Sequence, residues 1–104
     1  MKYIHKKIKK VIEIFKKIQD PELFISVYDL GLLYDIEIIE NDKIYILMTL
    51  TSPACPYVEE LITSIESSLK KIKNIKDTKI EITFSPPFNQ NMISQEGKFL
   101  LNIL

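Results

Sequence analysis

Residues 43–72, KIYILMTLTSPACPYVEELITSIESSLKKI, join a short apolar run to a longer segment with periodic hydrophobicity. From Ile44 to Leu50, apolar side chains occupy most positions of both alternating sets, which predicts an inner strand covered on both faces. Beyond the prolines, apolar residues recur every three or four positions, which predicts a helix over residues 56–72 with Pro56 in its first turn. This strand–helix unit decides the fold, because such a helix carries the chain across to a parallel strand.

Upstream of this unit, alternating apolar and acidic residues at 34–38 predict a half-buried strand that the turn at 39–43 joins as a hairpin. Gly31 lies just before this strand between apolar neighbours, a position typical of a positive-φ turn or a close backbone approach. Apolar residues spaced by three and four among lysines predict an amphipathic helix over residues 3–19, which Asp20-Pro21 ends.

Downstream, alternation at residues 79–84 predicts a third strand, and the prolines of SPPFNQN (85–91) cannot continue its ladder. Ser94 is placed to cap a short last helix. We therefore expect a small single α+β domain over residues 1–104, in the order α-β-β-α-β-α. Its three-stranded mixed sheet should carry the helices mainly on one face.

The composition narrows the class of protein. The chain of 104 residues is 46% hydrophobic and 27% charged, which is typical of one small globular domain. No apolar run approaches the roughly 18 residues of a membrane-spanning helix. All basic residues are lysine, and the absence of arginine disfavours a sequence-specific nucleic-acid reader. We therefore expect binding to neither nucleic acid nor membrane. A lone cysteine indicates a reduced thiol, so we also expect a cytoplasmic protein.

The charges are segregated although their sum is zero. Residues 1–17 carry seven lysines against Glu13 alone, and residues 18–66 carry ten acids against Lys43 alone. This pattern suits docking or head-to-tail self-association. It equally suits an ordinary solvated surface.

Cys55 lies where the inner strand gives way to the helix, at or beside the helix N-cap. Free amides and the helix dipole there lower the pKa of a thiol, and a thiolate binds metals and attacks electrophiles. Two features weigh against this interpretation: a free cysteine often packs as a small hydrophobe, and Glu59 and Glu60 would raise the thiol pKa again. The single histidine, His5, lies among lysines, so a Cys–His catalytic pair is not expected.

Five short motifs together resemble the small iron–sulfur assembly family, whose members include bacterial SufT, the PaaD subunit associated with phenylacetate degradation and the eukaryotic cytosolic iron–sulfur assembly adaptor. The motifs are DPEL (20–23), VYDLGLLYDIEI (27–38), MTLTSPACP (48–56), SPPF (85–88) and ISQEGK (93–98). The resemblance covers residues 8–104. It implies a small α+β domain that helps to deliver or mature iron–sulfur clusters and is not an enzyme.

The resemblance also implies site residues. The key cysteine of the family falls on Cys55, as a cofactor-binding residue and transient metal ligand, with Glu22, Asp29, Gly31 and Thr51 in supporting loops and no catalytic residue. Iron–sulfur clusters normally take four thiolates, so one cysteine per chain cannot hold a cluster alone. A homodimer, a cysteine-bearing client or an external thiol would have to complete a transient site, and the resting protein need not carry iron or a cluster.

Three hypotheses for the function follow. The first is an assembly factor in which the Cys55 thiolate handles iron or a cluster, with the assembly machinery and client apoproteins as partners. The second is an adaptor that binds a cluster-delivery complex through its surface and never touches metal. The third is a thiol redox protein, which would need an external thiol because the chain has no second cysteine.

Overall fold

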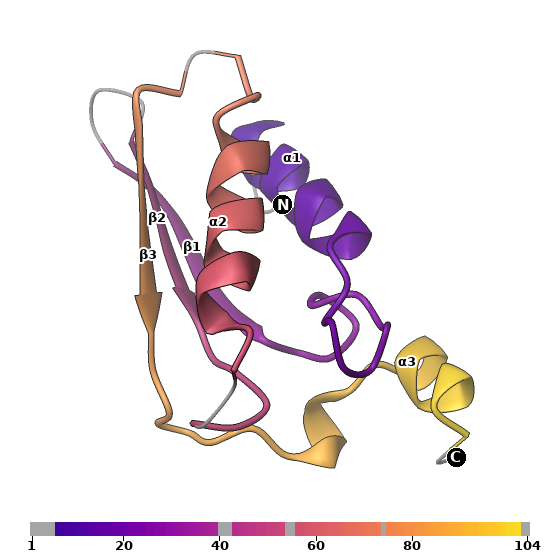
Figure 1. The fold of residues 1–104 in the computed structure, drawn as a ribbon. Helices are drawn as coiled ribbons and strands as arrows, with labels where there is room; N and C mark the ends of the chain where they lie inside the picture. Colours follow the sequence, from indigo (N-terminus) through magenta and orange to yellow (C-terminus); the bar gives the residue numbers. More distant parts are fainter. Residues whose placement is uncertain (1–5, 40–42, 54–55, 74, 103–104) are drawn as a thin grey trace, which may run out of the picture.

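A three-stranded sheet with helices on one face organises the chain (Figure 1). The computed structural model describes residues 6–39, 43–53, 56–73 and 75–102. Strand β1 (Leu33–Ile39) pairs antiparallel with β2 (Lys43–Met48), which pairs parallel with β3 (Asp77–Ile82). Helix α1 (Lys6–Lys17) precedes the hairpin, and α2 (Val58–Leu69) crosses from β2 to β3. A 3-10 turn, η1 (Gln90–Met92), and helix α3 (Gln95–Leu100) follow, so the expected α+β order and mixed sheet are confirmed.

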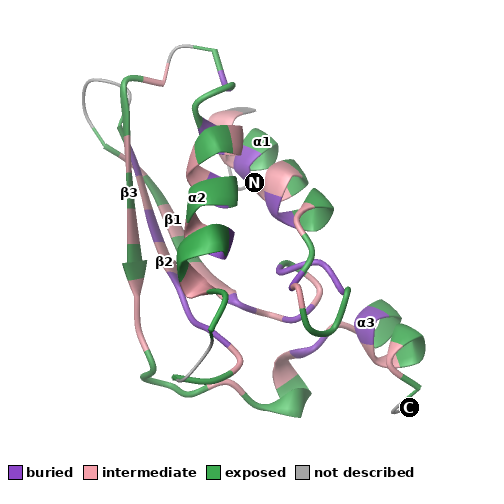
Figure 2. Ribbon diagram, viewed as in Figure 1, coloured by how far each residue is buried: buried purple, intermediate pink, exposed green. Residues whose placement is uncertain are grey.

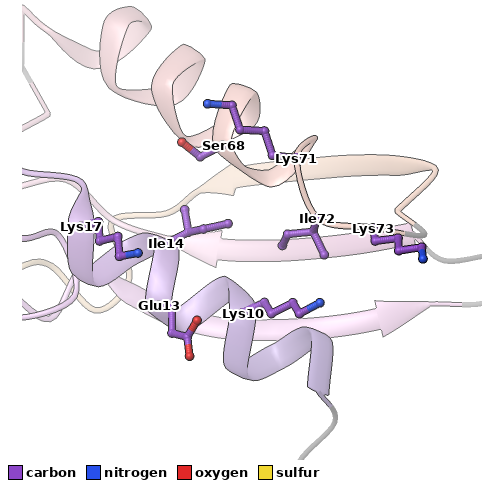
Figure 3. A pocket seen from close by; sticks show the side chains of 8 residues that line it. All are labelled: Lys10, Glu13, Ile14, Lys17, Ser68, Lys71, Ile72 and Lys73. Carbon is purple, nitrogen blue, oxygen red and sulfur yellow. The ribbon is translucent and has the colours of Figure 1, made fainter.

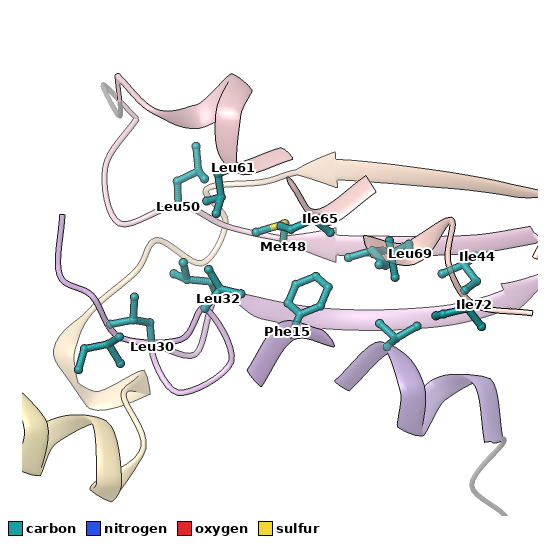
Figure 4. Packing of buried hydrophobic residues seen from close by; sticks show 14 of the residues in the cluster. Phe15, Leu30, Leu32, Ile44, Met48, Leu50, Leu61, Ile65, Leu69 and Ile72 are labelled. Carbon is teal, nitrogen blue, oxygen red and sulfur yellow. The ribbon is translucent and has the colours of Figure 1, made fainter. Parts of the chain in front are cut away.

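The core lies between the sheet and the helices α1 and α2 (Figures 2 and 4). Helix α1 buries Val11 and Phe15 on one stripe, and α2 buries residues at intervals of four. Each fully buried aliphatic or aromatic side chain contributes about 1.5–3 kcal/mol relative to an exposed one. No helix in the described ranges is both long and apolar enough to cross a membrane. The buried hydrophobic residues are Val11, Phe15, Ile25, Val27, Leu30, Leu32, Ile44, Ile46, Met48, Leu50, Leu61, Ile65, Leu69, Ile72 and Ile93.

The helices lie on one face of the sheet, as expected, but the expectation that β2 is covered on both faces is wrong. Ile44, Ile46 and Met48 are buried towards the helices, whereas Tyr45 and Leu47 on the other face are only half-buried. The Tyr45 hydroxyl donates a hydrogen bond to Glu81 Oε2 on β3, and this bond, ahead of desolvation and nearby carboxylates, raises the pKa of Tyr45 above its ordinary value.

Element boundaries differ from the expected ones where tertiary contacts intervene. Helix α1 ends at Lys17, because Gln19 instead forms a β-bridge with Ser26. Helix α2 has Tyr57 as its N-cap and ends at Leu69, so Pro56 precedes the helix rather than lying in its first turn. Strand β3 spans 77–82 instead of 79–84, because it pairs along the whole length of β2. Residues 3–5 of the expected first helix and 40–42 of the hairpin turn lie outside the described residues.

Candidate functional site

Three loops leave the sheet at the same end, and they contain the motifs singled out in the sequence. Leu33 at the start of β1 is paired with Met48 at the end of β2, and Met48 is paired with Ile82 at the end of β3. Three loops therefore meet the sheet at this one end, namely residues 20–32, 49–57 and 83–94 (Figure 1). The Thr49 amide donates to the Leu32 carbonyl at 2.8 Å, and the Thr83 amide donates to the Met48 carbonyl at 2.9 Å, which joins the loops directly.

The cysteine loop follows β2 and leads into α2. Cys55 and Ala54 lie outside the described residues, so the exposure and ionisation of this thiol stay predictions. On either side, Pro53, Pro56 and Tyr57 are exposed, and Thr51 is half-buried. The side chain of Tyr57 makes no capping hydrogen bond to the first turn of α2, and Glu59 and Glu60 occupy that turn. The first-turn amides of a helix favour negative charge nearby.

In the DPE motif, the buried aspartate is the structural residue. Asp20 is 3% exposed, and its Oδ1 accepts hydrogen bonds from the amides of Glu22 at 2.8 Å and Leu23 at 3.0 Å. This side chain closes the turn after α1, as carboxylates at loop starts commonly do. Glu22 is exposed at the tip of the turn, and in the described part of the chain its carboxylate forms no hydrogen bond or ion pair. Phe24 follows with φ of 57° and is 70% exposed.

Asp29 is the centre of a hydrogen-bond network that ties the C-terminal segment to the loop before β1. Its Oδ2 accepts from the Ser26 hydroxyl at 2.9 Å, and its Oδ1 accepts from the Ser94 hydroxyl at 2.8 Å. The Ser94 amide donates to the Asp29 carbonyl at 2.7 Å, and Ser94 Oγ accepts from the Gly97 amide at 3.0 Å. Ser94 therefore caps α3, as expected, and also anchors it to Asp29.

Gly31 allows the same segment to approach closely. Its φ is +79°, which confirms the expected positive-φ turn. A Cβ atom built on Gly31 would lie 2.4 Å from the carbonyl oxygen of Met92, closer than real Cβ contacts come. The Tyr34 hydroxyl adds a hydrogen bond to the Pro86 carbonyl at 2.6 Å. Residues 29–31 and 92–94 therefore lie against each other, and we call this contact the joint.

The structure places the expected site residues in two groups. Asp29 and Gly31 lie at the joint with the C-terminal segment, while no hydrogen bond within the described ranges links them to Glu22 or Thr51. Asp20 and Ser26 also support these loops. Ser26 was not among the expected site residues, although its place three positions before Asp29 is a typical turn-capping spacing. Among the described residues, no group of three or more His, Cys, Asp or Glu side chains could hold a metal ion.

Replacing Asp29 by alanine should lower the free energy of unfolding by about 2 kcal/mol, because two hydroxyls lose a charged acceptor and one of them, on Ser26, is buried. Urea denaturation measures this loss in the free energy of unfolding. A double-mutant cycle with Ser94→Ala should give a coupling energy of about 1 kcal/mol. Asp35→Ala is the matched control, since Asp35 is exposed and, among the described residues, accepts a hydrogen bond from the adjacent Ile36 amide alone. An equal loss in both aspartate variants would contradict the anchoring role of Asp29.

Comparisons with known proteins find similar sequences and structures over most of the chain. Residues 8–82 match the family model described as iron–sulfur cluster assembly protein. An Fe-S protein maturation auxiliary factor of Porphyromonas gingivalis is 33% identical over 94 residues, covering 90% of each chain. The maturation auxiliary factor SufT of Staphylococcus aureus is 36% identical over 81% of this chain and 96% of its own. A crystal structure of a domain of unknown function, DUF59, from Bacillus anthracis superposes with a TM-score of 0.86 at 27% identity, covering 92% of each chain.

Proposed function

The chain belongs to the iron–sulfur cluster assembly protein family, and from this membership we propose that it matures iron–sulfur proteins through the thiolate of Cys55. One observation carries the proposal. The three family motif loops leave the sheet at a single end, where the cysteine loop runs between exposed flanking residues into an α2 terminus without a side-chain cap from Tyr57. Such a terminus favours the thiolate over the thiol.

In this proposal an iron–sulfur cluster, or iron alone, is cargo. A thiolate is a soft ligand that suits both. One thiolate supplies only a quarter of the usual ligand set, so a second Cys55 in a homodimer, a client cysteine or an external thiol completes the site. A cluster held in this way is labile and passes readily to an apoprotein with more cysteines. Glu22, Asp29, Gly31 and Thr51 shape the loops around the thiol, and the protein is not an enzyme.

The partners in this proposal are the iron–sulfur assembly machinery and its client apoproteins, in the cytoplasm, with no role for nucleic acid or a membrane. Exposed apolar side chains support protein contacts in addition to the cysteine. Phe24 is 70% exposed, and Phe99 and Leu100 on α3 are 72% and 62% exposed. These side chains also favour the second candidate, an adaptor that binds a delivery complex without touching metal. The adaptor predicts that Cys55→Ala keeps full partner binding and full function.

Anaerobic reconstitution tests the proposed chemistry. The purified protein and Cys55→Ser are incubated with ferrous iron, sulfide and a thiol, desalted, and compared by iron and sulfide content, absorption and Mössbauer spectra. The unchanged protein should retain a labile cluster or iron, and the variant should retain at least about tenfold less, because a hydroxyl is a poor ligand for these species. Equal iron and sulfide in the two proteins would reject Cys55 as a ligand.

A further inference from the structure

An open groove lies between α1 and the C-terminal end of α2 (Figure 3). Its volume is about 580 Å³. Ile14 from α1 and Ile72, just after α2, lie between the two helices as an apolar floor. Lysines stand on both sides of this floor, and we name the feature the lysine groove. It is lined by Lys10, Glu13, Ile14, Lys17, Ser68, Lys71, Ile72 and Lys73.

The lysine groove carries a strong positive charge that its own lining does not neutralise. Four lysines and one glutamate give a formal charge of +3. Lys10, Lys71 and Lys73 are exposed, and none of the groove lysines forms an ion pair with Glu13 in the described part of the chain. Most of the described acids of residues 18–66 lie on the loops, on β1 and at the start of α2, whereas two lysines of α1 and two of residues 71–73 line this groove.

From this combination we propose that the lysine groove docks an acidic amphipathic segment of a partner protein. Carboxylates of such a segment would meet the lysines on the rim, and an apolar side chain would cover Ile14 and Ile72. A groove between two helices suits this occupant, because an amphipathic helix can lay its apolar side into it. A nucleic-acid backbone matches the rim less well, since it offers phosphates but no aliphatic group for the floor.

The lysine groove is at the opposite end of α2 from the cysteine loop (Figures 1 and 3). Helix α2, with 12 residues at about 1.5 Å each, separates the two ends by roughly 18 Å. A partner segment bound in the groove would therefore leave the loop around residues 51–57 uncovered. Docking here is independent of any chemistry at Cys55, so either proposal can fail alone.

The test measures binding of a short fluorescein-labelled peptide in which leucines recur at helical spacing among glutamates, by fluorescence anisotropy at low salt. The full chain should bind it, and Lys10→Glu/Lys71→Glu should weaken binding by at least about tenfold. The matched control is Lys9→Glu/Lys70→Glu, which makes the same charge change one residue away on the same elements. Lys9 and Lys70 are exposed and do not line the groove, so the control should weaken binding by less than about threefold.

Further arms of the experiment separate the proposal from simpler explanations. A peptide of the same charge with alanine in place of leucine should bind at least about tenfold more weakly, because it cannot cover the apolar floor. The proposal is overturned by absence of binding, by equal losses in the two lysine-pair variants, or by equal affinity for the two peptides. Sedimentation velocity measures whether the protein associates with itself. Self-association that is lost only in Lys10→Glu/Lys71→Glu would mean that a second copy of the chain occupies the groove, and it would overturn the proposal of a separate partner protein.

Discussion

A Cys55→Ser variant is expected to lose at least about nine-tenths of its maturation activity in cells, while its melting temperature stays close to that of the unchanged protein. The substitution exchanges one sulfur for one oxygen, and a serine hydroxyl is neither ionised at neutral pH nor a good ligand for iron–sulfur cargo. The measurement is the activity of several cluster-dependent enzymes in a strain that lacks this protein and carries the variant. The activities of all these enzymes should fall together, because the variant impairs the handling of the iron–sulfur cargo and not the contact with one client.

Ala54→Ser is the matched control for this prediction. It adds an oxygen atom to the neighbouring residue of the same loop and leaves the sulfur in place. It should therefore complement the strain nearly as well as the unchanged protein. If Cys55→Ser complements fully, the thiol chemistry is wrong and the adaptor becomes the better explanation. If both variants fail, the loop shape rather than the sulfur is what matters.

A Gly31→Ala variant is expected to lose about 3 kcal/mol of free energy of unfolding. Two costs combine at this position. The φ of +79° lies in the left-handed region, which costs a residue with a Cβ about 1–2 kcal/mol. The new methyl group would also lie 2.4 Å from the Met92 carbonyl oxygen, and overpacking of this kind costs about 1–3 kcal/mol. Urea denaturation, with the slope compared between the variants, measures the loss.

The accompanying structural effect should be local. Hydrogen exchange should show the amides of Ser94 and the residues of α3 losing protection in Gly31→Ala, because the joint with Asp29 opens first. Gly97→Ala is the comparison variant. There a Cβ atom would meet a methyl group of Ile93 at 2.8 Å and the Asp29 carbonyl oxygen at 3.2 Å, both longer than the closest contact at Gly31. The position needs no positive φ, and alanine gains about 1 kcal/mol of helix propensity. A Gly97→Ala loss as large as that of Gly31→Ala would contradict the backbone argument.

Much of the fold follows from local patterns in the chain. Apolar spacing of three and four identified α1 and α2, and alternation identified the three strands, because these periods are those of the helix and the pleat. The turn at Gly31 and the cap at Ser94 were also predicted, since each depends on the conformation of one residue and its close neighbours. The family followed from the order of five motifs, and Cys55 was singled out by its position within one of them.

Other features depend on residues far apart in the chain. Asp29 was expected to support the cysteine loop, which stays a prediction. The structure adds a hydrogen bond from Ser94, which is 65 residues away in the C-terminal segment. The lysine groove exists only because residues 10–17 and 68–73 lie side by side once α1 and α2 cover the sheet.

The elements, their order and the family could be read from the chain alone, because periodicity and motifs are carried by neighbouring residues. The open face of β2, the segment that Asp29 anchors and the place where the lysines gather became visible in the folded protein. Each of these depends on a contact that forms after the chain has folded back on itself, and no local pattern records which distant residue will be the partner.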